Sequence, residues 1–151
     1  MKCLMVCLGN ICRSPLGEGV LRNKVEQNGL DWEVDSCGTA GYHIGESPDP
    51  RSIEKAKEYG IDISHLKGRQ FHESDFDKFD LILVMDSENL KDIRSLIKDS
   101  EHRSKVRMIM DYAFPGKGVS VPDPYYGGPE GFENVYKMLD SACENIIQKH
   151  R

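Results

Sequence analysis

Four short segments of the chain have the apolar character that predicts β-strands. They lie at residues 2–7, 32–37, 81–85 and 106–110. Segments with a helical spacing of apolar residues separate them, and this alternation predicts βαβ units. The pattern therefore indicates an α/β fold with a parallel sheet that helices cover on both faces.

Helix signals follow each of these strands. Ser14 and Pro15 predict the start of the first helix, as N-cap and first helical residue, and residues 51–59 predict the second. Asp86 or Ser87 is expected to cap the helix that follows the third strand. The last helix has the most regular apolar stripe, formed by Phe132, Val135, Leu139, Ala142, Cys143, Ile146 and Ile147.

Length and charge exclude several classes of protein. A chain of 151 residues fits one domain, residues 1–151, with its own core. Its formal net charge of −5 argues against a nucleic-acid partner, which favours a basic surface. The apolar runs are too short to span a bilayer, and no signal peptide is found. We therefore expect a cytoplasmic globular protein without a membrane partner.

The five Cys and five His residues form no metal-ligand pattern. The cysteines contain no C-x-x-C pair, and the histidines contain no H-x₃₋₅-H pair. An odd number of Cys also argues against a disulfide framework. We therefore expect no metal and no cofactor, and we expect Cys3, Cys37 and Cys143 to be buried core residues.

The segment Cys7-Leu8-Gly9-Asn10-Ile11-Cys12-Arg13-Ser14-Pro15 carries the candidate chemistry. A thiol ends a strand, and an arginine stands six positions later at the start of a helix. Gly9 and Asn10 tolerate unusual backbone angles, so the loop can point its N–H groups at one centre. The helix dipole and the planar fork of Arg13 suit a phosphate. The sequence therefore predicts an oxyanion pocket with the Cys7 sulfur at its floor.

The same surroundings favour the thiolate form of Cys7, which would attack a bound phosphate in line. Ser14 is expected to donate a hydrogen bond to the sulfur as well as to cap the helix, and Asn10 is expected to hold the loop. The leaving oxygen needs a proton, and Asp123 is the candidate acid because it lies in a loop of prolines, tyrosines and glycines. An ordinary surface turn is the alternative interpretation of that loop.

The Cys7–Pro15 segment, together with the late Asp123-Pro124-Tyr125-Tyr126, resembles the low-molecular-weight protein tyrosine phosphatases over essentially the whole chain. The resemblance implies a small doubly wound sheet of four parallel strands. It also implies hydrolysis of phosphotyrosine, and of aryl phosphates, through a phosphocysteine intermediate. By position, Cys7 would be the nucleophile, Arg13 would bind phosphate and Asp123 would be the general acid.

The resemblance also implies supporting residues. A hydrogen-bond network under the loop is implied at Asn10, Ser14, Ser36 and His65. The walls around the substrate ring are implied at Leu8, Ile11, Tyr42, Tyr125 and Tyr126. Cys12 matches a family position that traps an oxidised nucleophile in a reversible disulfide, and simple packing within the loop is the alternative. His43, beside Tyr42, is expected to be a solvated loop residue, and tuning of the substrate's charge preference is the alternative.

Three other activities compete with this interpretation. An arsenate reductase on the same scaffold passes oxidation to further cysteines, and residues 80–110 contain none. A phosphoarginine phosphatase has a polar Thr where Ile11 stands and lacks the tyrosine pair. A phosphate-binding module without catalysis would lack Cys7 or Asp123. The expected partner is a phosphotyrosine protein, with phosphate in the site and a monomeric enzyme, and weak self-association through the tyrosine pair stays open.

Overall fold

The computed structural model describes all 151 residues, and its sheet confirms the predicted parallel α/β architecture. The strands are β1 (Lys2–Cys7), β2 (Glu33–Gly38), β3 (Leu81–Val84) and β4 (Val106–Met108). They pair in the order β2-β1-β3-β4, and every pair is parallel. β1 is therefore an inner strand, and its end lies at the centre of the sheet's carboxyl edge.

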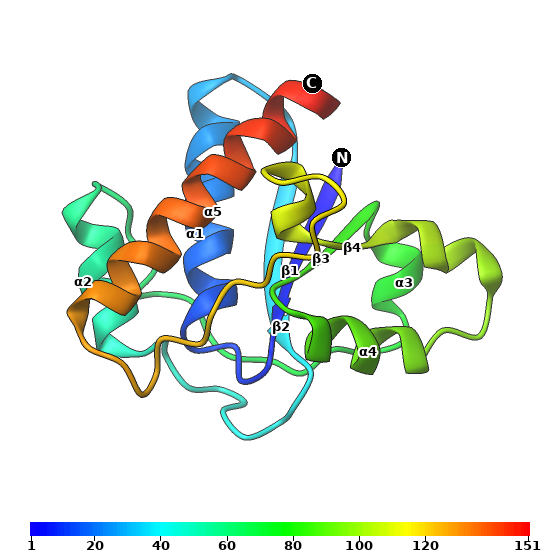
Figure 1. Cartoon of the computed structure of the whole chain (residues 1–151), viewed down its shortest axis with the longest axis horizontal. Helices are drawn as coiled ribbons and strands as arrows, with labels where there is room; N and C mark the ends of the chain where they lie inside the picture. Colours follow the sequence, from blue (N-terminus) through cyan, green and yellow to red (C-terminus); the bar gives the residue numbers. More distant parts are fainter.

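Helices cover both faces of this sheet, as a doubly wound fold requires (Figure 1). One face carries α1 (Arg13–Gln27) and α5 (Pro129–His150), with α2 (Pro50–Glu58) packed against both. The other face carries α3 (Asp75–Lys78) and α4 (Ser87–Ser95). Two 3₁₀ helices, Ser100–Lys105 and Ile109–Tyr112, flank β4.

The side chains of β1 alternate between two cores. Cys3, Met5 and Cys7 pack with α1 and α5 in the larger cluster, whereas Leu4 and Val6 pack in the smaller one under α4. This alternation is the period-2 geometry of a strand. Because Cys7 belongs to the first set, its thiol lies on the side of the sheet where α1 begins.

The structure corrects several predicted boundaries. β2 begins and ends one residue later than expected, and β3 ends at Val84. β4 ends at Met108 because the chain turns there into a 3₁₀ helix. The short helix α3 was not predicted, since four residues are too few to show a helical period.

The N-termini of α1, α2 and α4 differ in whether a side chain caps them. α1 begins at Arg13 after Cys12, with no side-chain cap, so the prediction of Ser14 as N-cap is wrong. α2 is capped by Asp49, which accepts from the Arg51 N–H at 2.9 Å. Asp86 is confirmed as the cap of α4, because its carboxylate accepts from the Asn89 N–H at 2.8 Å.

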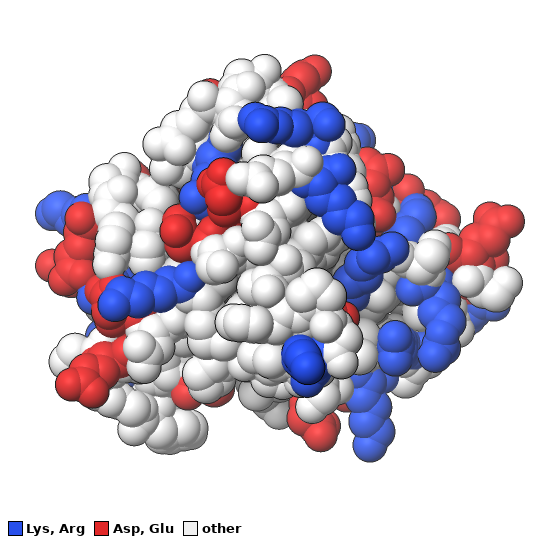
Figure 2. Space-filling view, turned by 45° about the horizontal axis from the view of Figure 1, so that its top comes forward, with Lys and Arg blue, Asp and Glu red and all other residues white.

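The surface carries both signs of charge. On the face shown in Figure 2, Lys and Arg side chains gather mainly on the side where α3 and α4 lie, and Asp and Glu side chains occur on both sides. None of the helices combines the length and the apolar composition that a membrane span requires.

Candidate active site

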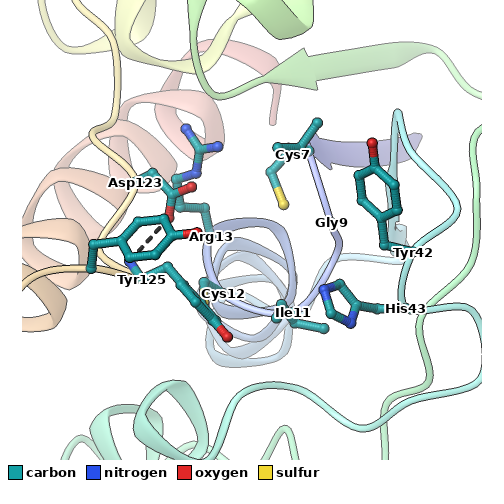
Figure 3. Close-up of a pocket in the computed structure, with 11 residues that line it drawn as sticks. Cys7, Gly9, Ile11, Cys12, Arg13, Tyr42, His43, Asp123 and Tyr125 are labelled. Carbon is teal, nitrogen blue, oxygen red and sulfur yellow. Dashed lines mark hydrogen bonds between the residues drawn. The ribbon is translucent and has the colours of Figure 1, made fainter.

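A cavity of about 280 Å³ at the carboxyl end of β1 collects the predicted chemical groups (Figure 3). Its lining residues are Cys7, Leu8, Gly9, Ile11, Cys12, Arg13, Tyr42, His43, Asp123, Tyr125 and Tyr126. The sequence predicts all of them except His43 as site residues. Ligands of parallel sheets bind just beyond the carboxyl ends of the strands, so this cavity is the candidate active site.

The phosphate loop, residues 8–13, turns around the Cys7 sulfur and leads directly into α1. Asn10 has a backbone φ of 58°, in the left-handed region that Asn tolerates better than most residues. Its N–H points at the Cys7 Sγ from 3.3 Å. A Cβ at Gly38 would lie 2.6 Å from the Leu8 carbonyl oxygen, so β2 can approach the loop only with glycine there. The thiol therefore lies at the base of the loop, at the positive end of α1.

The Asn10 side chain is the hub of the network under the loop. Its Nδ2 donates to the Ser14 Oγ at 2.8 Å and to the Ser36 Oγ at 3.0 Å, and its Oδ1 accepts from the Arg69 N–H at 3.0 Å. Only 4% of Asn10 is exposed, so unpairing these groups would cost about 1–3 kcal/mol for each buried partner. The loop is thus fixed to α1, to β2 and to the segment before α3.

The Ser14 side chain contacts the Cys7 sulfur instead of capping the helix. Its Oγ lies 3.0 Å from the Cys7 Sγ and 3.3 Å from the Cys37 carbonyl oxygen. This oxygen accepts from Asn10, and its one proton can be donated either to the Cys37 carbonyl oxygen or, when Cys7 is a thiolate, to the nearer sulfur. The predicted contact between Ser14 and the sulfur is present, at hydrogen-bond distance.

Glu18 extends the network and was not predicted. Its Oε1 accepts from the Ser36 Oγ at 2.7 Å, and the Arg22 guanidinium pairs with its other oxygen. Burial raises the pKa of Glu18 above its ordinary value, although the Ser36 hydrogen bond and the Arg22 charge oppose this shift. Ser14 and Glu18 are four residues apart on one helix face. This spacing is the feature of the sequence that indicates Glu18 as a neighbour of the network.

His65 lies outside the network, which corrects its predicted place there. Its side chain is exposed, and it makes no hydrogen bond with Asn10. The Asn10 Oδ1 is already satisfied by the backbone of Arg69. Just before His65, the Asp62 carboxylate accepts from the N–H and the hydroxyl of Ser64, a local turn that uses no group of the network.

Arg13 is buried, and two hydrogen bonds fix its guanidinium. Its Nη1 donates to the Asp86 Oδ2 at 2.6 Å and to the Val121 carbonyl oxygen at 2.9 Å. Asp86 therefore caps α4 with one oxygen and orients Arg13 with the other. Arg13 also lines the cavity, so these two hydrogen bonds fix a cation at the cavity wall.

Cys12 lies beside Cys7 in the cavity wall, and both thiols are free. Burial raises the pKa of Cys12 to about 12, and the negative charges of Asp49, Cys7 and Asp123 add to the shift. Cys12 is therefore a protonated thiol at neutral pH. Cys3, Cys37 and Cys143 are fully buried in the core, as expected.

Asp123 comes from the opposite wall, on the acid loop, residues 122–127. Its Oδ1 accepts from the Tyr125 N–H at 3.0 Å, the dashed bond of Figure 3. The rings of Tyr125 and Tyr126 meet edge to face with 5.0 Å between their centroids. Tyr42 is 78% exposed and Tyr126 93% exposed, so these aromatic walls stand open to solvent.

His43 also lines the cavity, whereas the sequence interpretation favours a solvated loop residue at this position. A Cβ on Gly9 would lie 3.1 Å from its ring, so the ring packs over the phosphate loop. Its Nδ1 lies 2.6 Å from the Glu46 Oε2. Its position beside Tyr42 is the feature of the sequence that indicates a place in the cavity wall. No group of three or more His, Cys, Asp or Glu side chains is arranged to hold a metal ion.

Comparison with known proteins agrees with this geometry. The family model described as low molecular weight phosphotyrosine protein phosphatase matches residues 2–150. This chain belongs to that family. It is a cysteine-based protein-tyrosine-phosphatase, as the phosphate-loop motif predicts.

Relatives of this phosphatase match it along nearly their full length. The low molecular weight phosphotyrosine protein phosphatase of Schizosaccharomyces pombe is 46% identical, over 98% of this chain and 96% of the relative. The protein tyrosine phosphatase of Entamoeba histolytica, solved with Hepes in its active site, superposes with a TM-score of 0.93 at 38% identity, covering 99% and 96% of the two chains. A Drosophila arginine phosphatase also superposes with a TM-score of 0.93, at 31% identity, covering 100% of this chain and 98% of the other.

Proposed function

We propose that Cys7 is the nucleophile of this phosphatase, that Arg13 binds the phosphate and that Asp123 is the general acid. One observation carries the proposal: a single cavity joins these three side chains, from β1, α1 and the acid loop. The Asn10 N–H and the Ser14 hydroxyl both lie within hydrogen-bond reach of the sulfur, which favours the thiolate.

The first step transfers the phosphoryl group to the enzyme. The phosphotyrosine dianion binds against the N–H groups of the phosphate loop and the Arg13 guanidinium. The Cys7 thiolate attacks phosphorus opposite the phenol oxygen, so an S–P bond forms as the P–O bond breaks. Asp123 gives its proton to the departing phenol oxygen, which leaves tyrosine and a phosphocysteine.

The second step regenerates the thiolate. The Asp123 carboxylate takes a proton from a water molecule, whose oxygen attacks phosphorus. An O–P bond forms as the S–P bond breaks, and inorganic phosphate leaves. Asp123 is then protonated again and ready for the next substrate.

The aromatic ring of the substrate lies between apolar and aromatic walls. Leu8 and Ile11 come from the phosphate loop, and Tyr42, Tyr125 and Tyr126 come from the two loops opposite. Stacking against such walls favours an aryl phosphate. The likeness to the Drosophila arginine phosphatase makes phosphoarginine the second candidate substrate, although Ile11 and the tyrosine pair favour phosphotyrosine.

The test is phosphate release from a phosphotyrosine peptide with EDTA present. We expect turnover by the wild type and by the matched control Cys12→Ser, and none by Cys7→Ser. Turnover by Cys7→Ser would overturn the assignment of the nucleophile. A wild type that prefers a phosphoarginine peptide would overturn the substrate class but leave the nucleophile in place.

We also propose that the enzyme acts as a cytoplasmic monomer on phosphotyrosine proteins, without nucleic-acid or membrane partners. Its five free cysteines, all buried, are typical of a reducing compartment. Its net charge of −5 disfavours a polyanionic partner. Sedimentation at increasing concentration would detect self-association through Tyr125 and Tyr126, the exposed pair beside the cavity.

A further inference from the structure

The acid loop, residues 122–127, is attached to the rest of the molecule at few points. Five of its six residues are exposed, and only Pro124 is buried. Two hydrogen bonds lie inside the loop, from the Tyr125 N–H to Asp123 and from the Gly127 N–H to the Pro124 carbonyl. One hydrogen bond ties it to another part of the protein: the Arg51 Nη1 donates to the Tyr125 carbonyl oxygen at 2.9 Å.

Arg51 makes this bond with its guanidinium already fixed on two sides. Its Nε and Nη2 donate to the two carboxylate oxygens of Asp49 at 3.0 and 2.9 Å. The rings of Tyr125 and Phe132 lie 5.2 and 4.8 Å from its central carbon, one on the acid loop and one on α5. The planar fork thus contacts a carboxylate, a carbonyl and two aromatic faces at once.

Asp49 connects this guanidinium to the phosphate loop. Its N–H donates to the Ile11 carbonyl oxygen at 2.7 Å, and its carboxylate caps α2. Hydrogen bonds from Arg51 keep the pKa of Asp49 below its ordinary value, so the carboxylate stays charged at neutral pH. A continuous chain of contacts therefore runs from Ile11 through Asp49 and Arg51 to Tyr125.

We propose that Arg51 is a positioning residue that sets where the Asp123 carboxyl lies over the nucleophile. The Tyr125 residue is held at both ends, since its carbonyl accepts from Arg51 and its N–H donates to Asp123. Fixing its carbonyl fixes the N–H that orients the carboxyl. This inference rests on the proposed role of Asp123 as general acid.

The experiment compares two substrates in Arg51→Gln. A phosphotyrosine peptide has a poor leaving group and needs the acid, whereas p-nitrophenyl phosphate has a good one and needs it little. We expect kcat/KM to fall about tenfold for the peptide and to stay within about twofold for p-nitrophenyl phosphate. Lys57→Gln is the matched control, because Lys57 is an exposed cation of the same helix without an ion pair, and it should change neither value.

A second variant separates charge from geometry. Arg51→Lys keeps the positive charge but lacks the fork that holds Asp49 and Tyr125 together. We expect it to lose peptide activity much as Arg51→Gln does. Full peptide activity in Arg51→Lys would overturn the proposal, because charge alone would then suffice.

Combination with Asp123→Asn decides whether Arg51 acts through the acid. In that background Arg51→Gln should cause no further selective loss on the peptide. An equal loss on both substrates, or a selective loss that persists without Asp123, would overturn the positioning role. If Asp123→Asn itself shows no selective loss, the proposed acid fails; if it does and Arg51→Gln does not, only the inference about Arg51 fails.

Discussion

The phosphate loop and the acid loop line the same cavity but are held in place by different means. The phosphate loop rests on a buried network in which Asn10 alone makes three side-chain hydrogen bonds. The acid loop is exposed except for Pro124, and one hydrogen bond from Arg51 ties it to another element. In the proposed mechanism, the phosphate loop surrounds the group that forms a bond to phosphorus, and the acid loop carries the group that moves a proton.

This difference suits the two tasks. Groups that stabilise charge in the transition state must be fixed beforehand, because their reorganisation would add to the barrier. A general acid must come within hydrogen-bond reach of a leaving oxygen that is attached to a bulky peptide. An open loop with an exposed tyrosine pair leaves room for such a peptide to enter.

The largest effect is expected from a substitution in the exposed acid loop. Asp123→Asn removes the proposed proton donor and leaves the buried network intact. We expect kcat/KM for a phosphotyrosine peptide to fall about 10²- to 10⁴-fold, the usual worth of general acid catalysis. Steady-state kinetics measures it, and a loss below fivefold would mean that another group supplies the proton.

The next effect concerns the reactivity of the Cys12 thiol, which is buried in the phosphate loop. Raising the pKa of Cys12 from 9.0 to about 12 leaves about a thousandfold less thiolate at neutral pH than an ordinary thiol has. Mass spectrometry after iodoacetate treatment at pH 7 should therefore find Cys12 unmodified in Cys7→Ser. Labelling should increase as the pH rises towards 12. Rapid labelling of Cys12 at pH 7 would show that this part of the loop opens to solvent.

Much of this site could be predicted from sequence because its parts are local. Cys7, Arg13 and Ser14 stand within one turn and the start of a helix, so their spacing alone indicates a phosphate pocket. Most of the fold could be predicted for the same reason, since the strands are short apolar runs and α5 has a regular apolar stripe. Boundaries such as the start of α1 were less accurate, because Ser14 bonds to a sulfur instead of capping the helix.

The rest depends on contacts that no local pattern shows. The Arg69 N–H reaches Asn10 across 59 positions of sequence, and Arg51 reaches Tyr125 across 74. The resemblance places His65 in the network, but its side chain is exposed and the backbone of Arg69 donates to Asn10 instead. Such partners follow from the packing of distant segments, so they become visible only in three dimensions.

A smaller effect is expected from loosening the buried network without touching the nucleophile. Asn10→Gly removes three side-chain hydrogen bonds but keeps a residue that accepts the φ of 58°. We expect kcat/KM to fall about 10- to 100-fold, equally for good and poor leaving groups, with lower thermal stability. Unchanged kinetics and stability would contradict the role of Asn10 as the hub.

The smallest effect is a change in how stability depends on pH. The raised pKa of Glu18 means that the folded state holds this proton more tightly than the unfolded state, so stability falls as pH rises from 4.5 through the raised value. Urea unfolding across this range should show Glu18→Gln gaining stability relative to the wild type as pH rises. Glu26→Gln, on the exposed part of the same helix, is the control and should run parallel to the wild type.

The most direct test of the different roles of the two loops compares one variant in each loop on two substrates, one with a poor leaving group and one with a good leaving group. The quantity is the ratio of kcat/KM for a phosphotyrosine peptide to that for p-nitrophenyl phosphate, which reports the need for a proton donor. We predict that Asp123→Asn lowers this ratio at least about tenfold and that Asn10→Gly leaves it unchanged. The same change of ratio in both variants would contradict the account, because the two loops would then share one task.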